Sequence, residues 1–151
     1  MGSPRIQRLH QHHPQAVSRC LAAACAAALL AGCNGGTVDQ HALKQDAGTI
    51  ASLATEGELL ANDVSKGAST TYFARVQSDN LRKEAANLAD ALGSRPTSAG
   101  IGPKVRQAGK LAGRVAVQLN RLHHDPVDRA LAKSVQHQLA DLSDEADKLA
   151  K

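Results

Sequence analysis

The stretch Pro103-Lys-Val-Arg-Gln-Ala-Gly-Lys-Leu-Ala-Gly-Arg-Val-Ala-Val-Gln-Leu-Asn-Arg-Leu122 decides the fold, because its apolar residues return every three or four positions. Side chains at this spacing share one face of an α-helix. The apolar face consists of Val105, Ala108, Leu111, Ala112, Val115, Leu119 and Leu122. Pro103 suits the first position of a helix, where its missing N–H is not needed. The pattern predicts a helix over 103–123 with one buried face.

The same spacing predicts three further helices, over 38–65, 70–92 and 126–149. Thr37-Val38-Asp39-Gln40 has the form of a capping box, and Lys66-Gly67 is a typical helix end. Ser69-Thr70 and Asp125-Pro126 are typical helix starts. The predicted buried positions are Leu43, Ala47, Ile50, Leu53, Ala54, Leu60, Ala61 and Val64 in the first helix, Phe73, Val76, Leu81, Ala85, Leu88 and Leu92 in the second, and Val127, Leu131, Val135, Leu139, Leu142, Ala146 and Leu149 in the last.

These four helices predict an all-α domain over 38–151, a small antiparallel up-down four-helix bundle. Short connections join the first helix to the second and the third to the fourth, which favours two antiparallel hairpins, and 93–103 is a loop. The alternatives are two looser hairpins, or hairpins that dimerise, because a core of Ala, Leu and Val buries little area. The only aromatic residues, Tyr72 and Phe73, are expected to plug the distal end of the core, or else to form an exposed contact patch.

The N-terminal segment has the features of an export signal. Three arginines and no acidic residue precede a charge-free run of twelve residues, Cys20 to Ala31. Such a run has the length of a signal-peptide core and is too short to span a bilayer. The run ends in Leu30-Ala31-Gly32-Cys33. An ordinary signal peptide or a buried Ala-rich helix is the alternative interpretation.

The sequence Leu30-Ala31-Gly32-Cys33 resembles the lipobox of bacterial lipoproteins. The rest of the chain resembles small, uncharacterised helical lipoproteins of the cell envelope. The resemblance implies that residues 1–32 are a signal peptide, cleaved between Gly32 and Cys33, and that Cys33 carries covalent lipid. Residues 33–37 would then be a short tether. The expected location is outside the cytoplasm, anchored by lipid to the cell membrane or the outer membrane.

Cleavage at Cys33 changes what cysteine content and charge imply. Cys20 and Cys25 leave with the signal peptide, so the mature chain has no cysteine pair for a disulfide. The full chain has 18 basic and 14 acidic residues, and three arginines lie before Cys33, which leaves 15 against 14. This balance gives no reason to expect nucleic acid as a partner.

The helix over 103–123 carries a basic stripe, the candidate partner-binding residues Arg106, Lys110, Arg114 and Arg121. No acidic residue lies between Asp90 and Asp125. One interpretation is a surface that docks an anionic partner: lipid headgroups, an envelope polymer or an acidic protein. The other is a solvated face paired with acids of neighbouring helices, such as Glu84, Asp128 and Asp141. On the same helix, Gly109 and Gly113 indicate a close approach to a neighbour, and their spacing also occurs in self-associating helices.

Metal and catalytic signals are weak. His123-His124-Asp125 is the only cluster of ligand-type residues in the mature chain, and adjacent helical residues point about 100° apart. The stretches 51–61 and 72–76 resemble ferritin-like bundles, but that family's Glu-x-x-His pair is absent, and Glu56 and Glu58 lie on different faces. We therefore expect no metal, no cofactor beyond the lipid on Cys33 and no enzymatic activity. The predicted function is an interaction or structural module; the alternative is a carrier or sensor of a small ligand or metal in the bundle interior or distal end.

Overall fold

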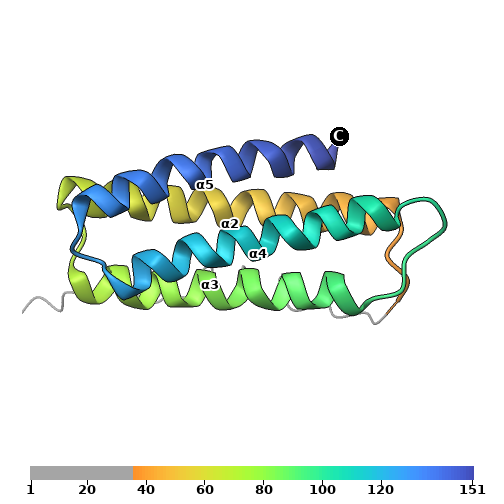
Figure 1. The fold of residues 1–151 in the computed structure, drawn as a ribbon, viewed down its shortest axis with the longest axis horizontal. Coiled ribbons are helices and arrows are strands. Elements are labelled where there is room, and N and C mark those ends of the chain that lie inside the picture. Colours follow the sequence, from red (N-terminus) through yellow and green to blue (C-terminus); the bar gives the residue numbers. More distant parts are fainter. Residues whose placement is uncertain (1–35) are drawn as a thin grey trace, which may run out of the picture. The chain divides into compact units, whose positions relative to one another are not determined.

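The computed structural model describes residues 36–151, which form an all-α, up-down four-helix bundle (Figure 1). The helices are α2 (Gln40–Lys66), α3 (Thr71–Ser94), α4 (Gly102–His124) and α5 (Arg129–Ala150). The predicted signal peptide 1–32 and the lipidation site Cys33 lie outside the described residues. Residues 36–151 form one compact unit, and the apolar core of the described residues lies within it. This unit therefore has what it needs to fold on its own.

The closest helix pairs are α2 with α5 and α3 with α4, whereas no Cα atom of α3 lies within 8 Å of one of α5 (Figure 1). The predicted antiparallel hairpins α2–α3 and α4–α5 are present, but their helices pack less extensively on each other than the pairs α2–α5 and α3–α4 do. Small residues explain the difference, because they let helix axes approach. A Cβ at Gly57 of α2 would lie 2.7 Å from Leu119 of α4 and 2.9 Å from Leu139 of α5. A Cβ at Gly109 of α4 would lie 3.5 Å from the Cβ of Leu92 on α3.

The start of α2 differs from the predicted capping box. The N-cap is Asp39, whose carboxylate accepts a hydrogen bond from the Ala42 N–H at 2.8 Å, and not Thr37. Val38 is the reason. It forms a parallel bridge with Thr97, donating its N–H to the Pro96 carbonyl at 2.8 Å and accepting from the Ser98 N–H at 2.9 Å. Residues held in this extended bridge cannot belong to a helix, so α2 begins only at Gln40.

The start of α5 is also later than the predicted Asp125-Pro126. Asp125 is the C-cap of α4, and the N-cap of α5 is Asp128. The Asp128 carboxylate accepts hydrogen bonds from the N–H groups of Ala130 and Leu131, both at 2.9 Å. Two satisfied N–H groups define the first turn of this helix. Two end signals hold: Thr70 caps α3 through the Phe73 N–H, and Gly67 ends α2 with a φ of 70°. Two others do not, because α3 continues through Gly93 to Ser94 and α4 begins at Gly102, which makes Pro103 its second residue and shortens the predicted 93–103 loop to 95–101.

The predicted apolar faces of α2 and α4 are buried at every position. On α3 the buried face is rotated: Ala74 and Ser78 are fully buried, whereas Phe73 is 54% and Val76 41% exposed. The smaller residues are therefore the ones that α3 turns into the core. Ser78 is compatible with the core because its hydroxyl donates to the carbonyl oxygens of Ala74 and Arg75. On α5 the predicted Val127 lies before the helix and is exposed.

Candidate functional site

The four basic residues predicted to bind a partner fall into two groups in the structure. Arg114 forms a two-pronged ion pair with Glu145 of α5, with N–O distances of 2.7 and 3.3 Å. Arg121 donates to the side-chain oxygens of Gln118 and Gln138, at 2.9 and 3.3 Å. Both side chains thus join α4 to α5, and Arg121 also bonds to a residue of α4 itself. They are committed to intramolecular contacts, and the acid involved is Glu145 rather than Glu84, Asp128 or Asp141.

Arg106 and Lys110 form the second group and lie in the half of α4 nearer its N-terminus. Among residues 36–151, neither has a carboxylate within ion-pair distance. Both are exposed. The cations of α4 that remain available for an external anion are therefore concentrated toward the end of the bundle that carries the 95–101 loop.

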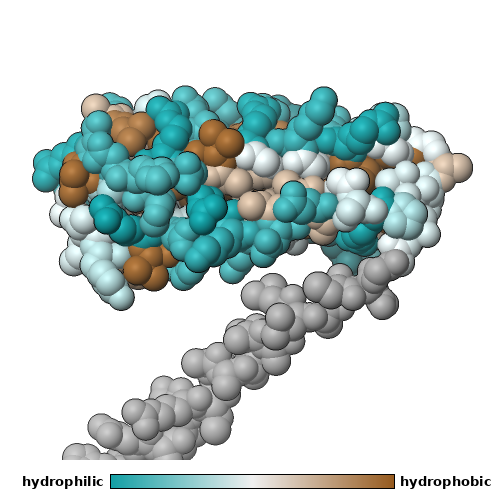
Figure 2. All heavy atoms as spheres, turned by 60° about the horizontal axis from the view of Figure 1, so that its bottom comes forward, coloured by the Kyte–Doolittle hydropathy of each residue, from teal (hydrophilic) through white to brown (hydrophobic). Residues whose placement is uncertain are grey.

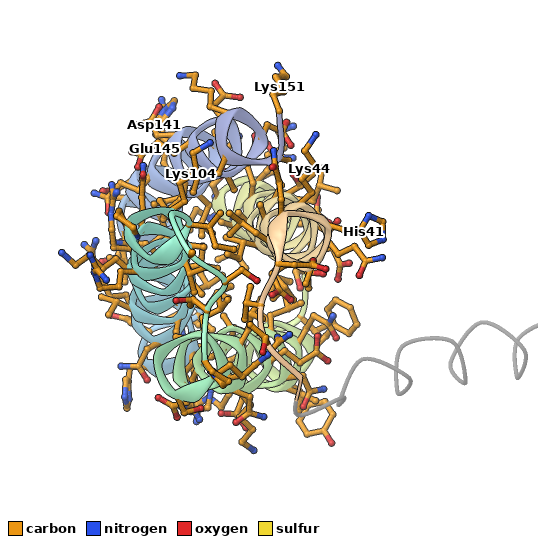
Figure 3. All side chains as sticks on the ribbon, turned by 90° about the vertical axis from the view of Figure 1, so that its right-hand side faces the viewer. His41, Lys44, Lys104, Asp141, Glu145 and Lys151 are labelled. Atoms are coloured by element: carbon orange, nitrogen blue, oxygen red, sulfur yellow. The ribbon has the colours of Figure 1, made fainter. Side chains whose placement is uncertain are left out.

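Three lysines on different parts of the chain line a cavity of about 140 Å³ at this same end. Lys44 of α2, Lys104 of α4 and Lys151 after α5 line it, over a floor that includes Leu43, Ile101 and Leu149. Figure 3 looks onto this end and shows the three lysines on the side of the bundle where α5 lies. The sequence did not suggest this cluster, because the lysines are far apart along the chain. The up-down topology is the signal that could have found it, since it places the starts of the first and third helices and the end of the last helix together.

The histidine cluster does not form a metal-binding arrangement. The Nδ1 atom of His123 lies 3.1 Å from the Arg75 carbonyl oxygen, and the rings of His123 and His124 are 5.3 Å apart at 68°. His41 is hydrogen-bonded to Gln45 on the exposed surface of α2. In the part of the chain that the structure describes, no group of three His, Cys, Asp or Glu residues is placed to hold a metal ion.

A half-buried ion pair joins two elements at the end of the bundle that carries the 95–101 loop. Arg95, after α3, lies 3.3 Å from the Asp46 carboxylate of α2. Burial raises the pKa of the Asp46 carboxyl, although the charge and hydrogen bond of Arg95 act in the opposite direction. The Arg95 Nε atom is buried and has no hydrogen-bond partner among the described residues. This pair joins the start of α2 to the 95–101 loop, next to the Val38 bridge.

Of the two predicted close-approach glycines on α4, Gly109 contacts α3, whereas no atom of another described helix lies within 4 Å of a Cβ built at Gly113. The interior between the helices is filled by apolar side chains such as Ile50, Leu111, Leu119 and Leu139.

Within residues 36–151, no helix combines the length and apolar character that crossing a membrane requires. Comparison of the chain with protein-family models, curated proteins and solved structures finds no match.

Proposed function

We propose that this chain is an exported lipoprotein of the bacterial cell envelope, anchored by lipid on Cys33, whose helical bundle is a non-catalytic module that docks an anionic partner. The signal features of residues 1–32 and the lipobox support the anchor. The available cations Arg106 and Lys110 support the anionic partner.

The observation that carries the proposal is the Val38 bridge. Val38 is fully buried and hydrogen-bonded on both sides to the 95–101 loop region. The start of the described chain is therefore fixed at the end of the bundle that carries Lys44, Lys104 and Lys151. Cys33 precedes Val38 by five residues, which span at most about 18 Å. A lipid on Cys33 would hold these cations close to the headgroup layer.

This geometry favours an anionic surface beside the membrane, lipid headgroups in the first place. Each Lys or Arg near an anionic bilayer contributes about 1 kcal/mol of attraction, so several act together. An envelope polymer or an acidic protein would meet the same cations. The carrier or sensor alternative gains no support, because the described interior is occupied by apolar side chains.

Two measurements test the proposal. In cells, Cys33→Ala should move the full chain from the membrane fraction to a released or unprocessed form. In vitro, residues 36–151 should bind phosphatidylglycerol vesicles and not phosphatidylcholine vesicles, with binding falling as salt rises. Arg106→Glu/Lys110→Glu should weaken vesicle binding by more than about tenfold, since two attractive charges become repulsive.

The matched control is Lys66→Glu/Lys133→Glu, which changes net charge equally on exposed lysines away from this end. It should weaken binding far less. Equal loss in the two double variants would mean that net charge, not this surface, governs binding. Retention of the anionic-vesicle binding by Arg106→Glu/Lys110→Glu would overturn the docking proposal while leaving the anchor proposal standing.

A further inference from the structure

The only two aromatic residues of this protein are both on its surface. Tyr72 is 80% and Phe73 54% exposed. Leu59, which lines the same depression as Phe73, is 59% exposed, and Val76, one helical turn after Phe73 on α3, is 41% exposed. We call these four residues the apolar patch. Figure 2 shows hydrophobic residues on the surface toward the left-hand end of the bundle, opposite the 95–101 loop. Large apolar side chains gathered on a surface typically mark an interaction site.

The patch borders a groove between α2 and α3. Leu59 and Leu60 of α2 line one side and Phe73 and Gln77 of α3 line the other, around an open depression of about 260 Å³. The groove exists because α3 turns Ala74 and Ser78 toward the core and packs most closely on α4. The α2–α3 contact is correspondingly looser, although a short turn joins these two helices.

Carboxylates border this groove. Glu56 and Asp63 of α2 also line it. No lysine or arginine of residues 36–151 forms an ion pair with either of them. A ligand that covers the groove would bring its own positive charges to these two acids. A second copy placed symmetrically on the patch would instead bring like charges together, and an anionic bilayer would be repelled in the same way.

We propose that the α2–α3 groove is the docking site for an amphipathic helical segment of a partner protein, with apolar residues on one face and lysines or arginines flanking them. A third helix fits a groove between two helices, with anchors spaced at i, i+3 or i+4, and i+7. Phe73 and Leu59 are the apolar anchors on this chain, and Glu56 and Asp63 select the basic flanks. This site is distinct from the cation-lined end proposed above and does not depend on it.

The test uses residues 36–151 and two synthetic amphipathic helices that share one leucine face. One peptide carries lysines beside that face, and the other carries glutamates at the same positions. Fluorescence anisotropy should give saturable binding of the lysine peptide, about tenfold or more tighter than of the glutamate peptide. Leu59→Gln and Phe73→Gln should each weaken lysine-peptide binding by about tenfold, the loss expected of an interface anchor.

The matched control is Val117→Gln on α4, because Val117 is as exposed as Leu59, at 59%, and does not line the groove. It should leave binding unchanged. Because all three substituted side chains are more than half exposed, the helical circular dichroism should stay the same. The charge-swapped variant Glu56→Lys/Asp63→Lys should reverse the preference, binding the glutamate peptide more tightly than the lysine peptide.

Equal binding of the two peptides, or no reversal in the charge-swapped variant, would overturn the proposed basic partner. Loss of binding in Val117→Gln equal to that in Leu59→Gln would place the site elsewhere. Dimerisation of residues 36–151 in sedimentation that Phe73→Gln abolishes would identify a second copy as the occupant and would likewise refute the proposal.

Discussion

Gly57 is the position where one added methyl group tests the helix packing most directly. A Cβ there would lie 2.7 Å from Leu119 Cδ2 and 2.9 Å from Leu139 Cδ1, closer than carbon atoms approach without a shift. Both leucines are fully buried, so neither can move its methyl group into solvent. Gly113 on α4 is the matched position, since no neighbouring atom lies within 4 Å of a Cβ there.

The two substitutions, Gly57→Ala and Gly113→Ala, share one favourable contribution. Alanine is better than glycine inside a helix by about 1 kcal/mol, and both positions are helical. Gly113→Ala should therefore raise the free energy of unfolding by about 1 kcal/mol. At Gly57 the same gain is opposed by overpacking, which typically costs about 1–3 kcal/mol. Because the helix-propensity contribution cancels, the variants should differ by about 1–3 kcal/mol.

Urea unfolding of residues 36–151, followed by helical circular dichroism, measures this difference. With a denaturant slope of about 2 kcal/mol per molar, the midpoints of the two variants should differ by about 0.5–1.5 M. In a Leu139→Ala background, Gly57→Ala should be less harmful, since one of the two crowded methyl groups is gone. Equal midpoints for Gly57→Ala and Gly113→Ala would refute the close approach of α2 to α4 and α5.

Two further predictions concern the N-cap of α5 and the loss of stability at low pH. Asp128→Ala should lower the free energy of unfolding by about 1 kcal/mol, because the Ala130 and Leu131 N–H groups lose their acceptor. The control Asp125→Ala should change it by less than about 0.5 kcal/mol. Equal effects of the two substitutions in thermal unfolding would disprove Asp128 as the N-cap. Hydrogen bonds from Lys83 and Arg82 lower the pKa of Asp79 from 3.8 to about 2, so its contribution is fully present above pH 4 and is lost as pH falls toward 2. The urea midpoint of wild type should therefore exceed that of Asp79→Asn at pH 5 and converge with it near pH 2, and a constant offset across this range would contradict the reasoning.

The sequence predicts the fold class and the buried faces of α2 and α4 because long helices with apolar residues every three or four positions have one consistent orientation. It fails on α3 for a physical reason. Phe73 and Val76 are more hydrophobic than Ala74 and Ser78, so periodicity selects them as the buried residues. The structure buries the smaller pair instead, and α3 packs closely on α4. Side-chain size against a neighbouring helix is not encoded in the periodicity of one helix.

The spacing of the basic residues within α4 predicts the basic stripe, but which of them are paired and which are available depends on the neighbouring helices. Arg114 pairs with Glu145 because α4 and α5 lie side by side, a fact that the sequence of α4 cannot contain. The Val38 bridge is equally non-local, since it joins residues almost sixty positions apart. Contacts between elements, rather than patterns within them, thus decide which candidate residues remain on an accessible surface.

The exposure of both aromatic residues can be weighed against what folding alone would favour. Burying a phenylalanine side chain stabilises a protein by about 1.5–3 kcal/mol, and this small core of Ala, Leu and Val has few other large groups to bury. Leaving Phe73 outside is therefore unfavourable for stability, which supports a role in contact with a partner. Leu59 lies nineteen residues after the start of α2, about 30 Å along the helix from the cation-lined end. Sites so far apart act additively, so the groove and the cationic end should each keep their binding when the other is altered.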